Sequence, residues 1–381
     1  MLRTDDLDYH LPDELIATTP ADPRDSARLM VLSRTDPGRL EHRLVRDLPE
    51  YLARDLMVVN ATRVLPARFR GVREDTGGMA EGLFVESGSP GAWTVLLKMR
   101  RMRPGVVVLL IDHEGKPCGV RLRLIERTGE DNGAWRVAVE DEHGASVAVA
   151  PPELLARIGL TPLPPYIRAA RKAGHLEVPD ERDRTTYQTV YATDRGERPG
   201  CGSVAAPTAG LHFTPSLLER LAAKGVRRAE VTLDVGLGTF KPVEAEFIEQ
   251  HPMHAEWCGV PEETAGAITA ARQGGSRIIA VGTTSARTLE SFESPEEMLR
   301  VHSKETRILI TPGYRFRHVD VLMTNFHLPR STLMAMVAAF LTSPESTTPQ
   351  EGVARLKAAY EGAVREGYRF YSYGDAMLIL P

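Results

Sequence analysis

A run of hydroxyl side chains follows an apolar stretch near residue 281. Residues 278–281 are apolar, and the chain continues through Gly282 with Thr283, Thr284, Ser285 and Arg287. A helix that begins near Ser285 would present N–H groups without internal partners and the positive end of its dipole. Such an end binds phosphate or carboxylate, and Arg287 would add a two-pronged contact. Three hydroxyls exceed the needs of a helix cap, so we expect an anion site, with a simple cap at Ser285 as the alternative.

A second polar loop lies between an apolar stretch and a helix signal. Residues 319–323 are apolar apart from Asp320, and Asn325 and His327 follow before Ser331, which is expected to cap a helix over 331–341. Ligands of α/β sheets lie outside the carboxyl ends of strands. Asn325 and His327 are therefore placed to contact a ligand, although a histidine in such a loop is as often a hydrogen-bonded structural residue.

Two histidines and a carboxylate occur together in the sequence His251-Pro252-Met253-His254-Ala255-Glu256. Pro252 disfavours a regular helix that would present both histidines on one face, and no fourth ligand is near, so a metal site is not expected. Proton transfer or substrate contact by His254 and Glu256 fits these residue types better.

Three further stretches contain residue types that often bind ligands. Residues 205–214 place His212 in a loop shaped by glycine and proline, and residues 368–375 include Tyr373 and Asp375 among aromatics able to stack on bases. Packing in a core is the simpler role for those aromatics. The sequence from Asp234 to Gly238 resembles the nucleotide loop of methyltransferases, but Pro242 disfavours the helix that should follow.

The elements that must position these residues are of two kinds. Between residues about 72 and 150 the chain alternates short apolar segments with glycine-rich turns, which predicts a small all-β barrel or sandwich. Its expected strands are 83–85, 93–97, 106–111, 120–125 and 135–139. The alternation of Val120, Leu122 and Leu124 with Arg121 and Arg123 is typical of a half-buried strand.

On both sides of this block, apolar segments alternate with helix signals, a pattern typical of an α/β protein. Apolar strands are expected at 56–59, 229–235, 278–281, 319–323 and 376–380, and helices at 215–224, 285 onward, 331–341 and 353–365. Residues 169–184 and 343–350 are predicted to be polar loops. We therefore expect an α/β domain made of residues 1–71 and 151–381, with residues 72–150 inserted as a β domain.

Composition limits the remaining choices. The chain has 381 residues, three widely spaced cysteines and a formal net charge of −4. The sequence contains neither a secretory signal nor a membrane span, so we expect a cytoplasmic protein. Because the net charge is negative, any binding to nucleic acid must use local basic patches, such as Lys98 to Arg103, the arginines between Arg54 and Arg73 (including Arg63), or Arg168 with its neighbours.

Taken in order, ten segments resemble the S-adenosylmethionine:tRNA ribosyltransferase-isomerases. The resemblance covers most of the chain outside the β block and is sharpest from Thr324 to Leu333. The segments are DYHLPDELIATTPADPRDSARLMVL, VVNATRVLPAR, LPPYI, TTYQTVYA, GSVAAPTAGLHFT, VTLDVGLGTFKPV, HPMHAEW, VGTTSARTLES, PGYRFRHVDVLMTNFHLPRSTL and YRFYSYGDAMLI.

The resemblance implies a fold and an activity. The fold is an α/β main domain with a mixed, barrel-like sheet and helices, carrying an inserted small all-β barrel. The activity is transfer and isomerisation of the ribosyl part of S-adenosylmethionine onto 7-aminomethyl-7-deazaguanine at the tRNA wobble position, with release of adenine and methionine. S-adenosylmethionine is then a co-substrate, no cofactor is tightly bound, tRNA is the partner, and the protein is a monomer.

The implied chemistry gives roles to the residues singled out above. A base must remove a proton from the carbon beside the sulfonium, adenine must be protonated as it leaves, and the attacking amine must be neutral. His254 and His327 are the first choices for these proton transfers, because imidazole titrates near working pH. Glu256, Asp375 and His212 are further choices. Substrate contacts are expected from Thr283, Thr284, Ser285, Arg287, Asn325, Arg63 and Tyr373.

The chain departs from the family pattern at three places, and these departures concern how the protein would bind tRNA. Ala61 stands where an acidic or amide residue is expected, methionines interrupt Lys98 to Arg103, and the segment from Ile167 to Arg184 is long. Three alternatives stay open: a methyltransferase, on the basis of Asp234 to Gly238; a non-catalytic RNA-binding protein; and a family member with a changed substrate, which Ala61 indicates.

Overall fold

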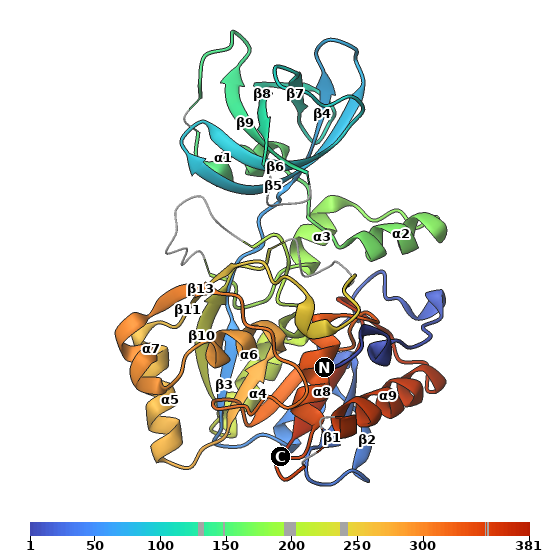
Figure 1. Ribbon diagram of the computed structural model, residues 1–381, viewed down its shortest axis with the longest axis vertical. Coiled ribbons are helices and arrows are strands. Elements are labelled where there is room, and N and C mark those ends of the chain that lie inside the picture. Colours follow the sequence, from blue (N-terminus) through green and yellow to red (C-terminus); the bar gives the residue numbers. More distant parts are fainter. Residues whose placement is uncertain (129–132, 148, 194–202, 237–242, 347, 349) are drawn as a thin grey trace.

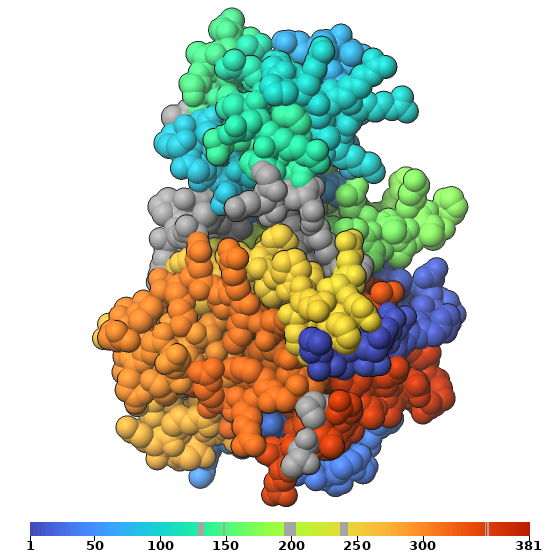
Figure 2. All heavy atoms as spheres, in the orientation of Figure 1, coloured from blue at the N-terminus to red at the C-terminus, as the bar shows by residue number. Residues whose placement is uncertain are grey.

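A closed barrel and a larger sheet make up the protein, seen here in a computed structural model that describes residues 1–128, 133–147, 149–193, 203–236, 243–346, 348 and 350–381. The barrel forms one lobe and the sheet with its helices forms the other (Figure 1). A space-filling view shows the barrel standing apart at the top of the molecule (Figure 2).

The larger sheet is mixed and has nine strands. Its order is β13 (Ser303–Thr306), β11 (Glu256–Gly259), β10 (Arg227–Leu233), β3 (Leu56–Asn60), β12 (Ile278–Val281), β14 (Val321–Asn325), β15 (Ala376–Leu380), β1 (Arg28–Ser33) and β2 (Leu40–Leu44). Strands β10, β3, β12 and β14 are parallel, so their carboxyl ends meet at one edge, whereas β15 runs antiparallel to β14. The sheet is open rather than barrel-like, because β13 and β2 end it at two separate edges.

Helices cover both faces of this sheet. Leu56 and Val58 of β3 pack into a core with α5 (Glu262–Gln273), α6 (Gly282–Glu290), α7 (Pro295–Val301), α8 (Thr332–Leu341) and α9 (Gln350–Arg365). Met57 and Val59 point to the opposite core, which contains α4 (Pro215–Ala223) and the short helix η4 (Val45–Glu50). Because both faces are buried, β3 and its neighbours are apolar along their whole length, as is usual for parallel strands.

Two of these helices begin at the capping residues that the sequence predicted. The Thr214 hydroxyl accepts a hydrogen bond from the Leu217 N–H at 3.1 Å, and Pro215 occupies the first helical position of α4. The Ser331 hydroxyl accepts from the Met334 N–H at 3.3 Å at the start of α8. A side chain that satisfies a helical N–H is a local feature, so the sequence alone identifies both starts.

The barrel is built from consecutive antiparallel strands between β3 and α1 (Pro151–Ile158). Its strands are β4 (Arg68–Arg73), β5 (Met79–Ser89), β6 (Ala92–Lys98), β7 (Val107–Ile111), β8 (Pro117–Arg127) and β9 (Ala134–Asp141), closed in the order β4-β5-β6-β9-β8-β7. The inward side chains of β8 are Val120, Leu122 and Leu124, as the alternation predicted. Strand β4 begins before residue 72, where the sequence predicted the start of the β block, since Phe69 already belongs to the barrel core.

The segment 169–184 was expected to be a polar loop, and this expectation is wrong. It forms most of α2 (Pro165–Ala173) and α3 (Asp180–Thr186). The buried guanidinium of Arg171 binds the Asp183 carboxylate through two hydrogen bonds of 2.6 and 2.8 Å. Polar composition suggests exposure, but here two charged side chains pair with each other in the interior.

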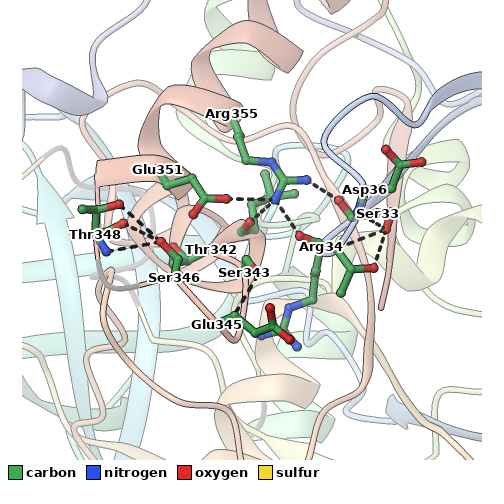
Figure 3. Close-up of polar contacts among 12 residues, drawn as sticks. Ser33, Arg34, Asp36, Thr342, Ser343, Glu345, Ser346, Thr348, Glu351 and Arg355 are labelled. Atoms are coloured by element: carbon green, nitrogen blue, oxygen red, sulfur yellow. Dashed lines mark hydrogen bonds and ion pairs between the residues drawn. The ribbon is translucent and has the colours of Figure 1, made fainter.

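Arg355 of α9 joins several backbone segments at the end of the sheet opposite the carboxyl ends of the parallel strands (Figure 3). Its guanidinium donates to the backbone carbonyls of Leu341 at 2.8 Å, Arg34 at 2.7 Å and Ser33. The Ser33 hydroxyl donates to the carbonyl of Pro381 at 2.8 Å. These contacts join α8, α9, β1 and the last residue.

Candidate active site

A pocket opens at the edge where the parallel strands end. It encloses about 580 Å³ of space that no atom fills, counting its open mouth. This is the position at which α/β sheets usually bind ligands. The lining residues are Tyr166, residues 205–209, Val235, residues 282–284 and 324–328, Leu333, Tyr371 and Ser372. We call this cavity the first pocket.

The start of α6 forms one wall of the first pocket. Helix α6 begins at Gly282, directly after β12, because Gly282 adopts a φ of 89° and turns the chain without a loop. Thr283 and Thr284 line the pocket, and the buried Thr284 hydroxyl has no hydrogen-bond partner among the residues that the structure describes. Ser285 neither caps the helix nor faces the pocket, since its hydroxyl donates to the Val281 carbonyl at 2.7 Å.

The end of β14 forms the facing wall. The Nε2 atom of His327 lies 2.8 Å from the Thr324 hydroxyl, and the His327 N–H donates to the Tyr360 hydroxyl at 2.8 Å. Burial lowers the pKa of His327 from 6.5 to about 3. The imidazole is therefore neutral at neutral pH and is a much weaker base than an exposed histidine.

Asn325 and Tyr371 join this wall to a loop before β15. The Asn325 side chain donates to the Tyr371 carbonyl at 3.1 Å and accepts from the Thr208 hydroxyl at 2.9 Å. Tyr371 lines the pocket with a φ of 71°, in the left-handed region that costs a side-chain-bearing residue about 1–3 kcal/mol. A strained backbone conformation persists only where surrounding contacts hold it. The contacts around Tyr371 thus keep its ring beside the pocket.

A second pocket adjoins the first. It contains about 370 Å³ of space that no atom fills, counting its open mouth, and is lined by His251, Met253, His254, Glu256, Arg287, Thr332 and Leu333. Leu333 lines both pockets, so they form neighbouring parts of one site. The structure thus places His254, Glu256 and Arg287 in the pocket that adjoins the one lined by Thr283 and His327.

The N-terminal segment supports the chain before His254. The Thr4 N–H donates to the Glu246 carbonyl at 2.9 Å, and the Leu2 N–H donates to the Glu249 carboxylate at 2.9 Å. Figure 2 shows these two parts of the surface side by side, the N-terminus in dark blue and the segment near residue 250 in yellow. The loop that carries His254 is thus anchored to a distant part of the chain.

Arg287 and Glu256 form a buried ion pair in the second pocket. The Arg287 Nη1 atom lies 2.5 Å from Glu256 Oε2, and both side chains are more than nine-tenths buried. The other carboxylate oxygen of Glu256 accepts from the Gly236 N–H at 3.1 Å. Glu256 therefore fixes the orientation of the guanidinium, an arrangement that the spacing of the two residues in the sequence does not reveal.

His212 and Asp375 lie behind the wall of the first pocket. The two ring nitrogens of His212 contact the carbonyls of Ala209 at 3.0 Å and Gly374 at 2.9 Å, and burial lowers the pKa of the imidazole. The Asp375 carboxylate accepts the backbone N–H groups of Arg28 at 2.9 Å and Arg369 at 2.8 Å. In this structure both side chains hold backbone segments together.

Tyr373 and Arg63 also lie outside both pockets. The Tyr373 hydroxyl contacts the Thr186 hydroxyl at 3.3 Å, and burial raises the pKa of this tyrosine to about 12. Arg63 is exposed just after β3, and its guanidinium contacts the Ala192 carbonyl at 3.4 Å. The aromatic residues that line the first pocket are Tyr166, Phe326 and Tyr371; only their positions in quoted family segments could have identified them.

The sequence raised two other possibilities, a metal site and a methyltransferase loop, and the described residues bear on each of them only in part. Within the described ranges, no three His, Cys, Asp or Glu side chains gather as a metal site would require. The glycine loop typical of methyltransferases extends to Gly238, which lies outside the described residues; its Asp234 accepts a hydrogen bond from the Thr62 hydroxyl at 3.1 Å. None of the helices in the described part of the chain is both long and apolar enough to cross a membrane.

The protein is an α/β protein with two adjoining pockets where the parallel strands of its sheet end. The family model described as "Queuosine biosynthesis protein" matches residues 4–379, and the chain belongs to this family.

Named relatives and a solved structure agree with this assignment. Proteins named S-adenosylmethionine:tRNA ribosyltransferase-isomerase from Methylocella silvestris and Symbiobacterium thermophilum are each 46% identical to the chain; the match covers 100% of this chain in both cases, and 98% and 100% of the two relatives. The crystal structure of S-adenosylmethionine tRNA ribosyltransferase from Thermotoga maritima is 32% identical, covers 98% of this chain and 100% of its own, and superposes with a TM-score of 0.51.

Proposed function

We propose that this protein transfers and isomerises the ribosyl part of S-adenosylmethionine onto 7-aminomethyl-7-deazaguanine at the tRNA wobble position. Adenine and methionine are released, and the tRNA carries an epoxycyclopentanediol. The observation that carries this proposal is the end-to-end match, at 46% identity, to enzymes named for this reaction. The two adjoining pockets support it, since the co-substrate has a nucleoside end and an amino-acid end.

The pockets divide the co-substrate between them in this proposal. The adenosine part occupies the first pocket, between the start of α6 and the end of β14, where Tyr166 and Tyr371 offer aromatic faces. The methionine part extends past Leu333 into the second pocket. The sulfonium and the reacting ribose carbons then lie near the junction of the two.

His254 is the proposed general base. It lies in the second pocket, on the side where the sulfonium acidifies the neighbouring carbon, and it is only half buried. His327 is the poorer base, because burial lowers its pKa to about 3. We assign His327 and Asn325 to holding the nucleoside, with Thr283 and Thr284 beside them.

The other predicted site residues act through the backbone or through a neighbour. Glu256 orients Arg287, whereas His212 and Asp375 hold the loops that carry the pocket wall. Ser285 stabilises the first turn of α6. Tyr373, which is buried, and Arg63, which is exposed, lie outside both pockets and are proposed to support the surface that meets the tRNA.

At the level of the whole molecule, we propose that the barrel is a domain inserted into the α/β domain. Its strands are consecutive in the chain and lie between β3 and β10 of the larger sheet, so the α/β part is discontinuous. The proposed boundaries are about 68 and 150, where β4 begins and α1 follows. We further propose a cytoplasmic monomer with the tRNA anticodon region as its partner, and S-adenosylmethionine as a co-substrate without a tightly bound cofactor.

The test is a product analysis with purified protein, S-adenosylmethionine and tRNA that carries 7-aminomethyl-7-deazaguanine. Free adenine, free methionine and a heavier tRNA are expected together. S-adenosylhomocysteine with methylated tRNA would instead identify a methyltransferase. Binding of tRNA without turnover would identify a non-catalytic RNA-binding protein.

A further inference from the structure

The guanidinium of Arg287 has donors that the protein does not use. Its Nη1 atom binds Glu256 at 2.5 Å, whereas Nε and Nη2 have no hydrogen-bond partner among the described residues. The residue is only 6% exposed and lines the second pocket. Nε–H and Nη2–H lie side by side on one edge of the guanidinium, so the two unused donors form a single fork.

A buried charged donor without a partner destabilises the folded protein, because it has lost its water and gained nothing in return. Glu256 balances the Arg287 charge and restrains the guanidinium, because its other oxygen accepts a hydrogen bond from the Gly236 N–H at 3.1 Å. The unused edge is therefore oriented in advance. Two parallel N–H donors match the two oxygens of a carboxylate.

We propose that the Nε–Nη2 edge of Arg287 binds the α-carboxylate of the methionine part of S-adenosylmethionine. This inference rests on the proposed function and adds the subsite that recognises the amino-acid end. Glu256 is a positioning residue that acts through Arg287. The contact anchors the co-substrate at the end remote from adenine and so sets where the sulfonium lies between the two pockets.

The geometry of α6 places the subsite at a suitable distance from the nucleoside. Arg287 follows Thr283 by four residues and Thr284 by three, so it neighbours both threonines on the surface of the helix. Arg287 is about 6 Å farther along the axis than Thr283, at about 1.5 Å per residue. One helix thus contacts the first pocket with its first turn and the second pocket with its last.

The local charge favours a carboxylate of an amino acid over an RNA phosphate. Glu256 already brings one negative charge to Arg287, and a second anion adds repulsion. An α-ammonium group, two bonds from the ligand carboxylate carbon, offsets that charge, whereas a phosphodiester carries no such group. The enclosed position of Arg287 also suits a small terminal group better than a polymer backbone.

The reaction leaves the carboxylate unchanged, so the same contact is available to the product. Methionine departs with its carboxylate and ammonium intact. We therefore expect L-methionine to inhibit in competition with S-adenosylmethionine, and methioninol, which lacks the carboxylate, to inhibit much less.

The test combines a substrate change with a residue change. Wild-type protein and the Arg287→Gln variant are assayed for adenine release with S-adenosylmethionine and with its decarboxylated analogue, which keeps the sulfonium and adenosine. We expect wild type to prefer the carboxylate-bearing substrate by roughly 10–100-fold in kcat/KM, and Arg287→Gln to lose most of that preference. Arg300→Gln, an exposed arginine on α7, is the matched control and should keep the preference.

The outcomes separate this inference from the proposed function. An undiminished preference in a folded Arg287→Gln variant would overturn the inference, as would equal use of both substrates by wild type. A raised KM for tRNA together with an unchanged substrate preference would indicate an RNA phosphate instead. Absence of adenine release from every protein would overturn the proposed function, and calorimetric binding of the two substrates would still test the Arg287 contact.

Removal of Arg287 leaves Glu256 buried beside the gap, so the variant must be shown to fold. If Arg287→Gln unfolds, Arg287→Lys keeps a charge for Glu256 but lacks the fork. It should discriminate the two substrates less than wild type does. Full discrimination by the lysine variant would contradict the forked contact, and the comparison of L-methionine with methioninol on wild type needs no variant.

Discussion

His254 and His327 are both imidazoles of the site, but their surroundings give them different chemistry. His327 is enclosed and contacts Thr324, and burial lowers its pKa to about 3. His254 lies half-buried in the neighbouring pocket. Residue type alone ranked the two equally, whereas their difference in burial supports the proposal that His327 holds a ligand and His254 moves a proton.

Substitution of the two histidines should therefore affect different kinetic parameters. We expect His254→Ala to lower kcat by about 10²–10⁴-fold with little change in the KM for S-adenosylmethionine, because loss of a general base affects the chemical step. His327→Ala should mainly raise that KM. Steady-state adenine release, with circular dichroism to verify folding, measures both effects. Unchanged kcat in His254→Ala would remove it as the base.

The buried His327 also makes stability depend on pH. Its pKa is about 3 in the folded protein against 6.5 for an ordinary histidine, so between these values the unfolded chain binds more protons. The stabilisation is complete above about pH 6.5 and is lost as the pH falls, at about 1.4 kcal/mol per pH unit. His327→Gln should thus reduce the difference in unfolding free energy between pH 7.5 and 5.0 by about 2 kcal/mol.

Urea unfolding at the two pH values measures that difference. The exposed residue His143 supplies the control, and His143→Gln should keep the wild-type pH dependence. Burial also lowers the pKa of His212, so some acid sensitivity remains in the His327 variant. Identical pH dependence in wild type and His327→Gln would argue against a neutral, buried His327.

The direct passage from β12 into α6 is the element on which both pockets depend. It requires Gly282 at a φ of 89°, where a side-chain-bearing residue is strained. We expect Gly282→Ala to destabilise the protein by about 1–2 kcal/mol and to reduce activity further by displacing Thr283 and Thr284. Thermal unfolding and adenine release measure the two effects.

Gly266 offers a matched comparison within α5. Its φ is not in the left-handed region and an added methyl group would meet no atom within 4 Å, so Gly266→Ala should leave activity unchanged and stability equal or slightly higher. Equal behaviour of the two alanine variants would contradict the importance assigned to the turn at Gly282.

Elements with local signals could be predicted from the sequence, and those that depend on distant partners could not. Thr214 and Ser331 mark helix starts because each caps its own helix. The start of α6 was placed too late, since nothing near Ser285 shows that the chain turns at Gly282. Helices α2 and α3 were missed because their polar residues include the buried pair Arg171 and Asp183.

The same distinction holds for the site. Thr283 and His327 could be expected to lie together because each follows a strand, and β12 and β14 prove to be parallel neighbours. Tyr371 was passed over for Tyr373, because only the backbone conformation shows which of the two faces the pocket. The pairing of Glu256 with Arg287 depends on tertiary packing between β11 and α6.

At the scale of the whole molecule, the proposed tRNA substrate is a polyanion, whereas the protein itself has a formal net charge of −4. The barrel lobe carries a basic segment after β6, in which Arg100, Arg101 and Arg103 are exposed (Figure 1). We expect replacement of these three arginines by glutamine to raise the KM for tRNA by about tenfold or more and to weaken its salt dependence. The KM for S-adenosylmethionine should not change.

Kinetics at two salt concentrations test this contact. Arg300→Gln combined with Arg365→Gln, both exposed on the α/β lobe, controls for the loss of charge as such. An equal rise in the KM for tRNA in the control would show a general charge effect rather than a contact on the barrel.

The central claim is that the ribosyl group, and not the methyl group, of S-adenosylmethionine reaches the tRNA. Two preparations of the co-substrate test it, one labelled with ¹³C in the ribose and one in the S-methyl group. We expect the ribose label to appear in the tRNA and the methyl label to leave with free methionine. Methyl label in the tRNA, or release of S-adenosylhomocysteine, would contradict it.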